Sequence, residues 1–346
     1  MKFLFFCQNS YAFGIIDPIR KVVLERGHEV FWFLKEELNT SFPYQEDAYT
    51  NSINALKKYP SDAIIVPGNE VPHYLRGVKV QIFHGLAGEK RTHFRIRHYF
   101  DLYLTQGPYF TDKFNELQRQ HRNFEVMETG WSKLDKMYAE QEDYSEEKQE
   151  LLNIHNAKKI ILFAPTFTPY LTCAELLKDE IISLASNKDY LILCKFHAMM
   201  APELIEAYRT IATEHDNVVY EEEKNISKFL ILADLMVSDT SSVVYEFLLL
   251  NKPVITFNNI AENKYWEDLD DPMVLAKSIE TTFLEDSYKS QREFIISNYH
   301  PYTDGRSSER MVTAIEHYIE KNGVPKKRRL SPYRKYRIHK RWRNHL

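Results

Sequence analysis

The chain begins with an alternation of short apolar runs and amphipathic segments. Residues 3–7 and 30–34 are apolar runs that predict buried strands, and between them Asp17 and Pro18 predict the start of a helix with proline in its first turn. Strand, helix and strand in this order indicate parallel strands joined by a crossover helix. The N-terminal part of the chain is therefore expected to form a doubly wound α/β sheet.

The same alternation continues and then restarts after a polar stretch. Residues 138–156 are rich in Glu, Gln and Lys and predict a connection that carries a surface helix. Before this stretch we expect helices at 52–59 and 109–120 and strands at 63–66, 78–83 and 102–105. After it we expect strands at 159–163, 190–195, 217–220, 235–238 and 254–257, and helices at 174–186, 202–214, 226–232 and 242–250. The pattern predicts two tandem doubly wound domains, 1–150 and 151–300, which face a cleft lined by the carboxyl ends of their strands.

Composition and charge exclude several classes of protein. The chain has 346 residues, of which 44% are hydrophobic and 27% are charged, as expected for a folded globular protein. Ten Lys and Arg residues and no acidic residue follow Gly323, whereas the remainder has 35 basic and 49 acidic residues and a net charge of −14. An acidic body with a basic tail at 323–346 does not fit a protein that binds nucleic acid over its whole surface. No uninterrupted apolar segment reaches 18 residues, and the first run is too short for a signal peptide, so we expect a cytoplasmic protein.

The first candidate site follows the strand expected at 78–83. His84 stands at the carboxyl end of this strand, and Gly85 and Gly88 follow it. Histidine accepts a proton near neutral pH, and glycine lets the backbone approach a ligand closely. A structural histidine bonded to a neighbouring carbonyl is the alternative interpretation.

The second half of the chain repeats this arrangement and adds a run of hydroxyl groups. Lys195 and His197 alternate with Phe196, so both can point toward one anionic group such as a pyrophosphate. After the strand at 235–238, the run 239–242 reads Asp, Thr, Ser and Ser and leads into an apolar helix, whose first N–H groups favour an anion. Simple helix capping would explain only one of these serines.

Several common sites are absent from the sequence. Neither of the glycine-rich nucleotide motifs GxGxxG and GxxxxGK[ST] occurs, nor does the zinc motif HExxH. The three cysteines, Cys7, Cys173 and Cys194, stand apart among apolar residues and are expected to be buried free thiols.

Taken together, the motifs resemble the CDP-glycerol glycerophosphotransferase family, which includes teichoic-acid-type polymerases and primases. The resemblance runs from about Val80 to Ile319 and is carried by ordered motifs at 83–85 with Lys90, 104–107, 130–135, 161–166, 195–197, 238–253 and 304–310. It departs from the family pattern at Ala198, where a proline is usual, and in the motif at 130–135.

The resemblance implies a GT-B fold with an acceptor-side N-terminal domain, a donor-binding C-terminal domain, and a crossover helix at 301–322. It implies transfer of glycerol phosphate or a related polyol phosphate from a CDP-alcohol to a glycan or lipid-linked acceptor, with release of CMP and without a metal or other cofactor. His84 and His197 are the implied catalytic residues, and Gly85 and Lys90 lie on the acceptor side. The implied donor and phosphate ligands are Lys195, Asp239, Thr240, Ser241, Ser242, Glu246, Arg306 and Arg310.

Two other functions remain open at this point, together with the role of the tail. A nucleotide-sugar glycosyltransferase of the same fold would release a nucleoside diphosphate instead of CMP. A non-catalytic nucleic-acid binder would act through the basic tail alone, although we expect no nucleic-acid partner. The tail cations alternate with Tyr333, Tyr336, Ile338 and Trp342, which favours contact with the anionic inner face of the cell membrane over a disordered solubilising tail.

Overall fold

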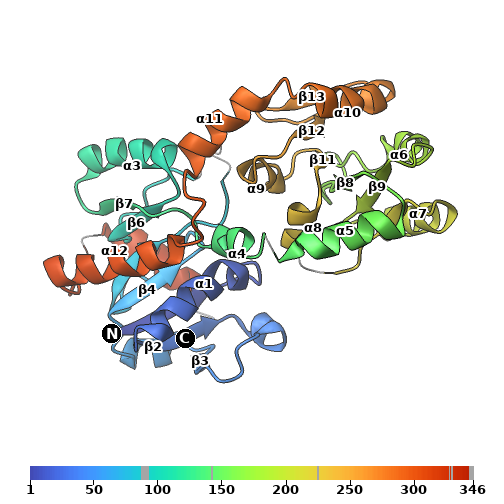
Figure 1. Ribbon diagram of the computed structural model, residues 1–346. Coiled ribbons are helices and arrows are strands. Elements are labelled where there is room, and N and C mark those ends of the chain that lie inside the picture. Colours follow the sequence, from blue (N-terminus) through green and yellow to red (C-terminus); the bar gives the residue numbers. More distant parts are fainter. Residues whose placement is uncertain (87–92, 142, 224–225, 327, 329, 343–346) are drawn as a thin grey trace. The chain divides into compact units, whose positions relative to one another are not determined.

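The computed structural model describes residues 1–86, 93–141, 143–223, 226–326, 328 and 330–342. The chain forms two compact units: unit 1 comprises Met1–Tyr138 and Asn298–Leu346, and unit 2 comprises Ala139–Ser297. In each unit a sheet lies between helices (Figure 1). All strand pairs in both sheets are parallel, so the predicted doubly wound α/β class is confirmed.

The sheet of unit 1 has seven strands, and its order reverses beside the first strand. Across the sheet the strands are β3 (Tyr49–Thr50), β2 (Glu29–Leu34), β1 (Lys2–Cys7), β4 (Ala63–Val66), β5 (Val78–Gln81), β6 (Leu102–Thr105) and β7 (Glu125–Glu128). Its helices are α1 (Ala12–Glu25), α2 (Ile53–Lys58), α3 (Pro108–His121), α4 (Lys133–Ala139), α12 (Ser307–Asn322) and α13 (Pro332–Arg341), with a 3₁₀ turn at Glu36–Ser41. Because the winding changes direction between β1 and β4, the loops at the carboxyl ends of the central strands are the expected ligand site.

The sheet of unit 2 repeats this topology with six strands. Their order is β10 (Val218–Tyr220), β9 (Tyr190–Cys194), β8 (Lys159–Phe163), β11 (Leu235–Ser238), β12 (Val254–Phe257) and β13 (Glu267–Leu269). The helices are α5 (Tyr144–Ile154), α6 (Lys178–Leu184), α7 (Pro202–Glu214), α8 (Ile226–Leu232), α9 (Val243–Leu249) and α10 (Leu275–Leu284), with a 3₁₀ turn at Pro272–Val274; α11 (Lys289–Tyr299) ends where the chain returns to unit 1. The change of direction lies between β8 and β11.

Two predicted helices begin in the wrong place. Helix α1 starts at Ala12 rather than at Asp17, so Pro18 lies inside the helix and not in its first turn. A proline at this position costs about 3 kcal/mol, and the buried Phe13, Ile15 and Ile19 on the same helix offset this cost by packing. The helix expected from residue 174 begins at Lys178, because residues 174–177 form a turn.

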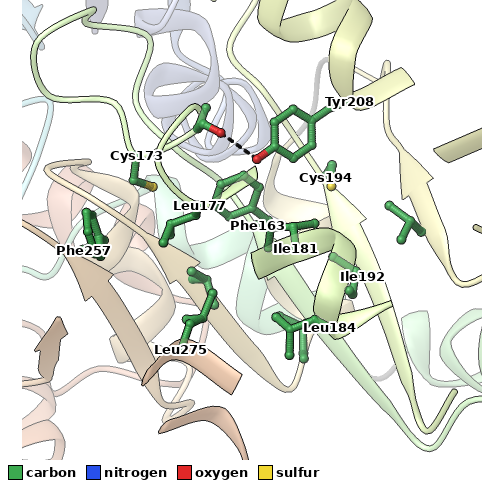
Figure 2. Packing of buried hydrophobic residues seen from close by; sticks show 14 of the residues in the cluster. Phe163, Cys173, Leu177, Ile181, Leu184, Ile192, Cys194, Tyr208, Phe257 and Leu275 are labelled. Carbon is green, nitrogen blue, oxygen red and sulfur yellow. Dashed lines mark hydrogen bonds between the residues drawn. The ribbon is translucent and has the colours of Figure 1, made fainter. Parts of the chain in front are cut away.

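One core cluster of unit 2 packs against the face of the sheet formed by alternate residues of strands β8 and β9. Figure 2 shows Phe163, Ile192 and Cys194 from these strands among the side chains of α6 and α7. The hydroxyl of Tyr208 donates a 2.7 Å hydrogen bond to the carbonyl of Ala174, so the buried polar atom is satisfied. Cys7, Cys173 and Cys194 are buried free thiols, as predicted.

The described residues of the basic tail are part of unit 1. Arg328 forms a nearly buried ion pair with Asp101 and donates to the carbonyl of Gly77 at 2.7 Å. Trp342, only 3% exposed, packs edge-on against Phe6 and Phe33 in the hydrophobic core. The expectation that Trp342 faces a membrane is therefore wrong, because its indole has an apolar pocket of its own.

Candidate functional site

In unit 1, His84 lies just beyond the carboxyl end of β5 and is exposed. Its Nδ1 atom is 3.0 Å from the carbonyl oxygen of Pro67, on the loop that follows the neighbouring strand β4. A carbonyl oxygen only accepts hydrogen bonds, so Nδ1 carries the proton and Nε2 carries the basic lone pair. This tautomer suits a general base. The carbonyl contact expected by the alternative, structural interpretation is thus present, and it also fixes the orientation of the ring.

A strained residue directs His84 away from the core. Phe83 has φ +59°, in the left-handed region that aromatic residues rarely adopt, and its ring is buried and stacked on His93. The expected strand therefore ends at Gln81 instead of residue 83. Strain of this kind persists where surrounding packing enforces it, and it is common at functional sites.

Two buried amides connect the loops around His84. Gln81 donates to the carbonyl of Gly68 at 2.6 Å, and Gln106, after β6, donates to the carbonyl of Gly85 at 3.1 Å. The loops after β4, β5 and β6 are thereby joined at one edge of the sheet. A Cβ atom at Gly85 would meet no atom of the described residues within 4 Å. Gly88 and Lys90 lie outside the described residues.

In unit 2, His197 follows β9 and is likewise exposed, but its hydrogen bond is of the opposite kind. Its Nδ1 atom accepts from the backbone N–H of Met199 at 3.1 Å, so in the neutral ring Nε2 carries the proton. Burial, and next the nearby Lys195, lower the pKa of His197. The neutral ring with an outward Nε2–H is a hydrogen-bond donor suited to a phosphate oxygen.

Lys195 is far less accessible than His197. It is 9% exposed, and its ammonium donates to the carbonyl of Phe196 at 3.0 Å. Burial lowers its pKa, while Glu221 and Glu223 act in the opposite direction. Lys195 therefore contributes positive charge from a buried position near the exposed His197.

Asp239 does not face solvent. Its carboxylate organises the loop after β8 that carries Thr166 and Cys173. It is fully buried, and its carboxylate accepts hydrogen bonds from the backbone N–H groups of Thr166 and Cys173 at 2.9–3.0 Å. Burial raises its pKa, although these hydrogen bonds oppose the shift. The loop held in this way carries Phe167, whose ring stacks on His197 at a centroid distance of 4.5 Å. Asp239 thus positions the loop, and direct phosphate binding by its carboxylate does not fit this geometry.

Of the three hydroxyl groups that follow β11, one has a structural partner and two are accessible. The hydroxyl of Thr240 accepts from the backbone N–H of Ile260 at 3.1 Å. Within the described residues, the hydroxyls of Ser241 and Ser242 make no hydrogen bond, and Ser242 does not cap α9 with its side chain. Glu246 is 5% exposed in the first turn of α9, where a carboxylate does not favour an anionic ligand. Ser241 and Ser242 are the better anion ligands of this group.

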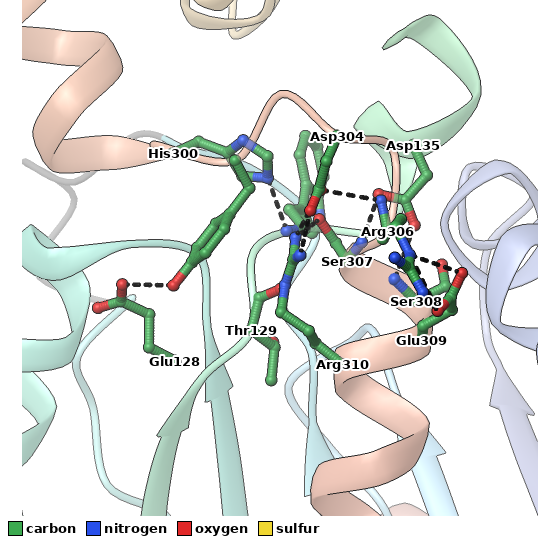
Figure 3. A network of polar contacts seen from close by, with 12 residues as sticks. Glu128, Thr129, Asp135, His300, Asp304, Arg306, Ser307, Ser308, Glu309 and Arg310 are labelled. Atoms are coloured by element: carbon green, nitrogen blue, oxygen red, sulfur yellow. Dashed lines mark hydrogen bonds and ion pairs between the residues drawn. The ribbon is translucent and has the colours of Figure 1, made fainter. Parts of the chain in front are cut away.

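Arg306 and Arg310 belong to a network inside unit 1 (Figure 3). Arg310 pairs with Asp304 at 2.8 Å and donates to the carbonyl of Thr129 at 2.9 Å, whereas the exposed Arg306 pairs with Glu309 at 2.6 Å. Both guanidinium groups are thus engaged by protein partners.

Sequence reasoning missed the residue that holds this network in place. The carboxylate of Asp135 accepts from the backbone N–H groups of Ser307 and Ser308 at 2.8 and 2.7 Å, and so caps α12 from 172 residues away. Gly130 has φ +85°, and a Cβ atom there would lie 2.4 Å from the hydroxyl of Ser307. Asp135 and Gly130 both lie in the motif at 130–135, so the resemblance was the available signal.

Comparisons with known proteins bear on the family and the fold. A family model described as CDP-Glycerol:Poly(glycerophosphate) glycerophosphotransferase matches residues 76–267. The teichoic acid ribitol-phosphate polymerase TarL of Staphylococcus aureus is 24% identical over 229 residues, which are 60% of this chain and 39% of the relative. A teichoic acid glycerol-phosphate transferase of the same organism is 27% identical over 185 residues, 49% of this chain and 44% of the relative. The match spans less than half the length of these two curated relatives.

A solved structure supports the fold independently. The wall teichoic acid polymerase TagF superposes with a TM-score of 0.65 at 16% identity, over 92% of this chain and 89% of that chain. This similarity shows the fold alone. With the two parallel sheets, it confirms the predicted GT-B fold.

Proposed function

The chain belongs to the CDP-glycerol:poly(glycerophosphate) glycerophosphotransferase family, and we propose that it transfers a polyol phosphate from a CDP-alcohol to an acceptor hydroxyl in cell-wall polymer synthesis. Relatives named for glycerol phosphate and for ribitol phosphate both match, so the proposal names the class of donor. CDP-glycerol is the first donor to test, and a glycan or lipid-linked alcohol is the acceptor.

The observation that carries the proposal is the tautomer of His84. With Nδ1 donating to Pro67, Nε2 accepts the proton of the acceptor hydroxyl. The acceptor oxygen forms a bond to the phosphorus that bears the polyol, and the bond from this phosphorus to the CMP oxygen breaks. The proton ends on His84, and CMP leaves with the electron pair of the broken bond.

The unit 2 loops hold the donor in this proposal. The Nε2–H of His197 and the hydroxyls of Ser241 and Ser242 donate to the diphosphate oxygens, and the buried Lys195 adds positive charge. Structural roles, and no contacts with the donor, are assigned to Asp239, Thr240 and Glu246. Arg310 joins α12 to the carbonyl of Thr129, Arg306 pairs with Glu309 at the start of α12, and neither is assigned to the donor. No metal or other cofactor is assigned.

One assay separates this function from the main alternative. The purified protein is incubated with CDP-glycerol and an acceptor, and the released nucleotide is identified. We expect CMP, and His84→Ala should lower turnover by about 10²–10⁴-fold while donor affinity is retained. Release of CDP, or of UDP from a nucleotide sugar, would instead indicate a glycosyltransferase. Loss of donor affinity with unchanged turnover in His84→Ala would contradict the assigned base.

The tail also supports contact with an anionic membrane surface as part of this proposal. Tyr333 and Tyr336, 68% and 63% exposed, lie one turn apart on α13 beside its cations. No helix in the described part of the chain is long and apolar enough to cross a membrane. Replacing both tyrosines by serine should weaken sedimentation with phosphatidylglycerol vesicles, and unchanged sedimentation would refute this contact.

A further inference from the structure

A pocket in unit 1 is lined by none of the residues assigned to catalysis. It has a volume of about 590 Å³ and is enclosed by α13 on one side and by residues 95–99 and 70–71 on the other. Six of its lining residues are cations: Arg95, Arg97, Arg334, Arg337, Lys340 and Arg341. Glu70 is the single acidic residue among the lining residues, so the lining carries a net charge of +5.

Few of these cations are neutralised by the protein. Arg341 pairs with Glu70 at 2.5 Å, and Arg334 donates to the carbonyl of Arg97 at 3.3 Å. Arg337 and Lys340 have no acidic partner among the residues that the structure describes. Burial lowers the pKa of the Arg97 guanidinium, and the neighbouring Arg95 adds to this effect. Like charges held together repel one another, and a bound anion relieves this repulsion.

The rest of the pocket is apolar. Its other walls come from Val71, Ile96, Tyr99, Ile338 and Trp342. Val71, Ile96, Tyr99 and Trp342 are at most 7% exposed and form part of the unit 1 core. A simple inorganic anion would leave this apolar surface without a partner. A ligand with both an anionic group and an apolar chain matches both parts of the lining.

Helix α13, which carries four of the six cations, is held in place by the fold. The tail is attached at one end by the ion pair between Arg328 and Asp101 and at the other by the buried Trp342. Between them, Ser331 caps α13 by accepting from the backbone N–H of Arg334. A preformed cluster of cations loses less conformational entropy on binding than a flexible basic tail.

We propose that this pocket binds the phosphate or diphosphate group of a membrane lipid, with the first part of the lipid's chain against the apolar wall. All of its lining residues belong to unit 1. The inference stands on the geometry of unit 1 and does not depend on the catalytic role of His84.

The test uses isothermal titration calorimetry of the full chain in saturating CDP-glycerol, which occupies any diphosphate site on the donor side. The probes are inorganic pyrophosphate and farnesyl diphosphate, which share the anionic group and differ in the apolar chain. We expect farnesyl diphosphate to bind about tenfold tighter or more, because its chain buries apolar surface. The double variant Arg337→Glu/Lys340→Glu should weaken this binding by about tenfold or more for each cation that contacts the anion.

The chain offers a matched control. Lys326 and Lys335 are exposed, lie in the same tail and do not line the pocket. Lys326→Glu/Lys335→Glu changes the net charge by the same amount and should alter affinity by no more than about twofold, because exposed charges at a distance are screened. All four positions are exposed, so both double variants should unfold at the same temperature as the parent chain.

Three results would overturn the proposal. The first is absence of farnesyl diphosphate binding by the parent chain. The second is equal weakening in the two double variants, which would indicate diffuse electrostatic attraction. The third is sedimentation with phosphatidylglycerol vesicles that the pocket variant leaves unchanged. Donor binding, measured separately by thermal shift, keeps a failure of the pocket distinct from a failure of the proposed function.

Discussion

His84 and His197 follow strands at non-equivalent positions in the two sheets, and their hydrogen bonds are opposite in kind. Each is exposed and follows a strand of a parallel sheet, β5 in unit 1 and β9 in unit 2. The Nδ1 atom of His84 faces a carbonyl oxygen, and that of His197 faces a backbone N–H. The neutral rings therefore present opposite groups at Nε2: a lone pair in unit 1 and a proton in unit 2.

Under the proposed function, this difference allows one residue type to serve two roles. The partner of Nδ1 is set by the local backbone, through Pro67 after β4 in one case and Met199 after β9 in the other. Phe83 enforces the first geometry through its positive φ. A base and a hydrogen-bond donor can thus be distinguished without any difference in residue identity.

The largest expected effect comes from making the same substitution at both histidines. Glutamine places an amide group near the position of Nε2, where it donates a hydrogen bond but takes up no proton at neutral pH. His84→Gln should therefore lower turnover by about 10²–10⁴-fold, whereas His197→Gln should keep most of the activity. Steady-state rates of CMP release from CDP-glycerol measure both.

The comparison between the histidines fails if the two glutamine variants behave alike. Equal, severe losses would mean that His197 also transfers a proton. Nearly full activity of His84→Gln would remove His84 as the base. His197→Ala removes the hydrogen-bond donor altogether and should weaken binding of the CDP-alcohol. It therefore distinguishes a lost hydrogen bond from a retained one.

The two units also differ in which parts of the chain build their cores, and a substitution of Trp342 tests this difference. The unit 1 core includes an indole from the C-terminal tail, whereas the unit 2 core is built from the continuous segment 139–297. Trp342→Ala should lower the free energy of unfolding of unit 1 by about 3–5 kcal/mol, because it leaves a cavity beside Phe6 and Phe33. Hydrogen exchange resolved by segment should show faster exchange in β1 and β2 and little change in β8. Equal protection in the variant would mean that the tail merely rests on the surface.

Acid should also affect unit 1 through a buried histidine. His300 is fully buried, its Nε2 accepts from the backbone N–H of Trp131, and burial lowers its pKa from 6.5 to about 4. The unfolded chain takes up this proton below pH 6.5, whereas the folded chain does so only near pH 4. The contribution to stability is therefore complete above pH 6.5 and is lost as the pH falls toward 4, by up to about 3 kcal/mol.

Urea unfolding between pH 7 and pH 4 measures this effect. His300→Gln keeps an acceptor for Trp131 but does not titrate, so its stability should depend less steeply on pH than that of the parent chain. An identical pH dependence in the two proteins would exclude His300 as the sensitive group.

The sequence predicted the central strands well and the sheet edges poorly, for a physical reason. Central parallel strands are buried on both faces and read as apolar runs, such as the one in β8. The edge strand β13 and the strand β7 contain several polar residues and are largely half-buried, so they give no such run and were missed. Helix α1 was misplaced because local proline chemistry suggested a start that tertiary packing overrides.

From the sequence, only those site residues that directly follow an apolar strand could be predicted. His84 and His197 were found because each follows an apolar run. The roles of Asp135 and Asp239 depend on partners 172 and 73 residues away, which no local pattern reveals. The packing of Trp342 into the unit 1 core likewise depends on contacts with β1 and β2 near the other end of the chain.

The smallest expected effect tests the role of the Ser241 and Ser242 hydroxyls separately from that of His197. Ser241 and Ser242 make no hydrogen bond within the described residues, so removing either hydroxyl leaves no protein partner unsatisfied. Ser241→Ala or Ser242→Ala should each weaken CDP-glycerol binding by about 1 kcal/mol, or about fivefold, without loss of protein stability. Ser186→Ala, which removes an exposed hydroxyl bonded to the carbonyl of Ser183, is the matched control and should not change donor affinity. In the proposed function the hydroxyls act on the donor and His84 acts on the acceptor proton. Lower turnover with unchanged donor affinity in the serine variants would therefore show that the roles assigned to the two units are wrong.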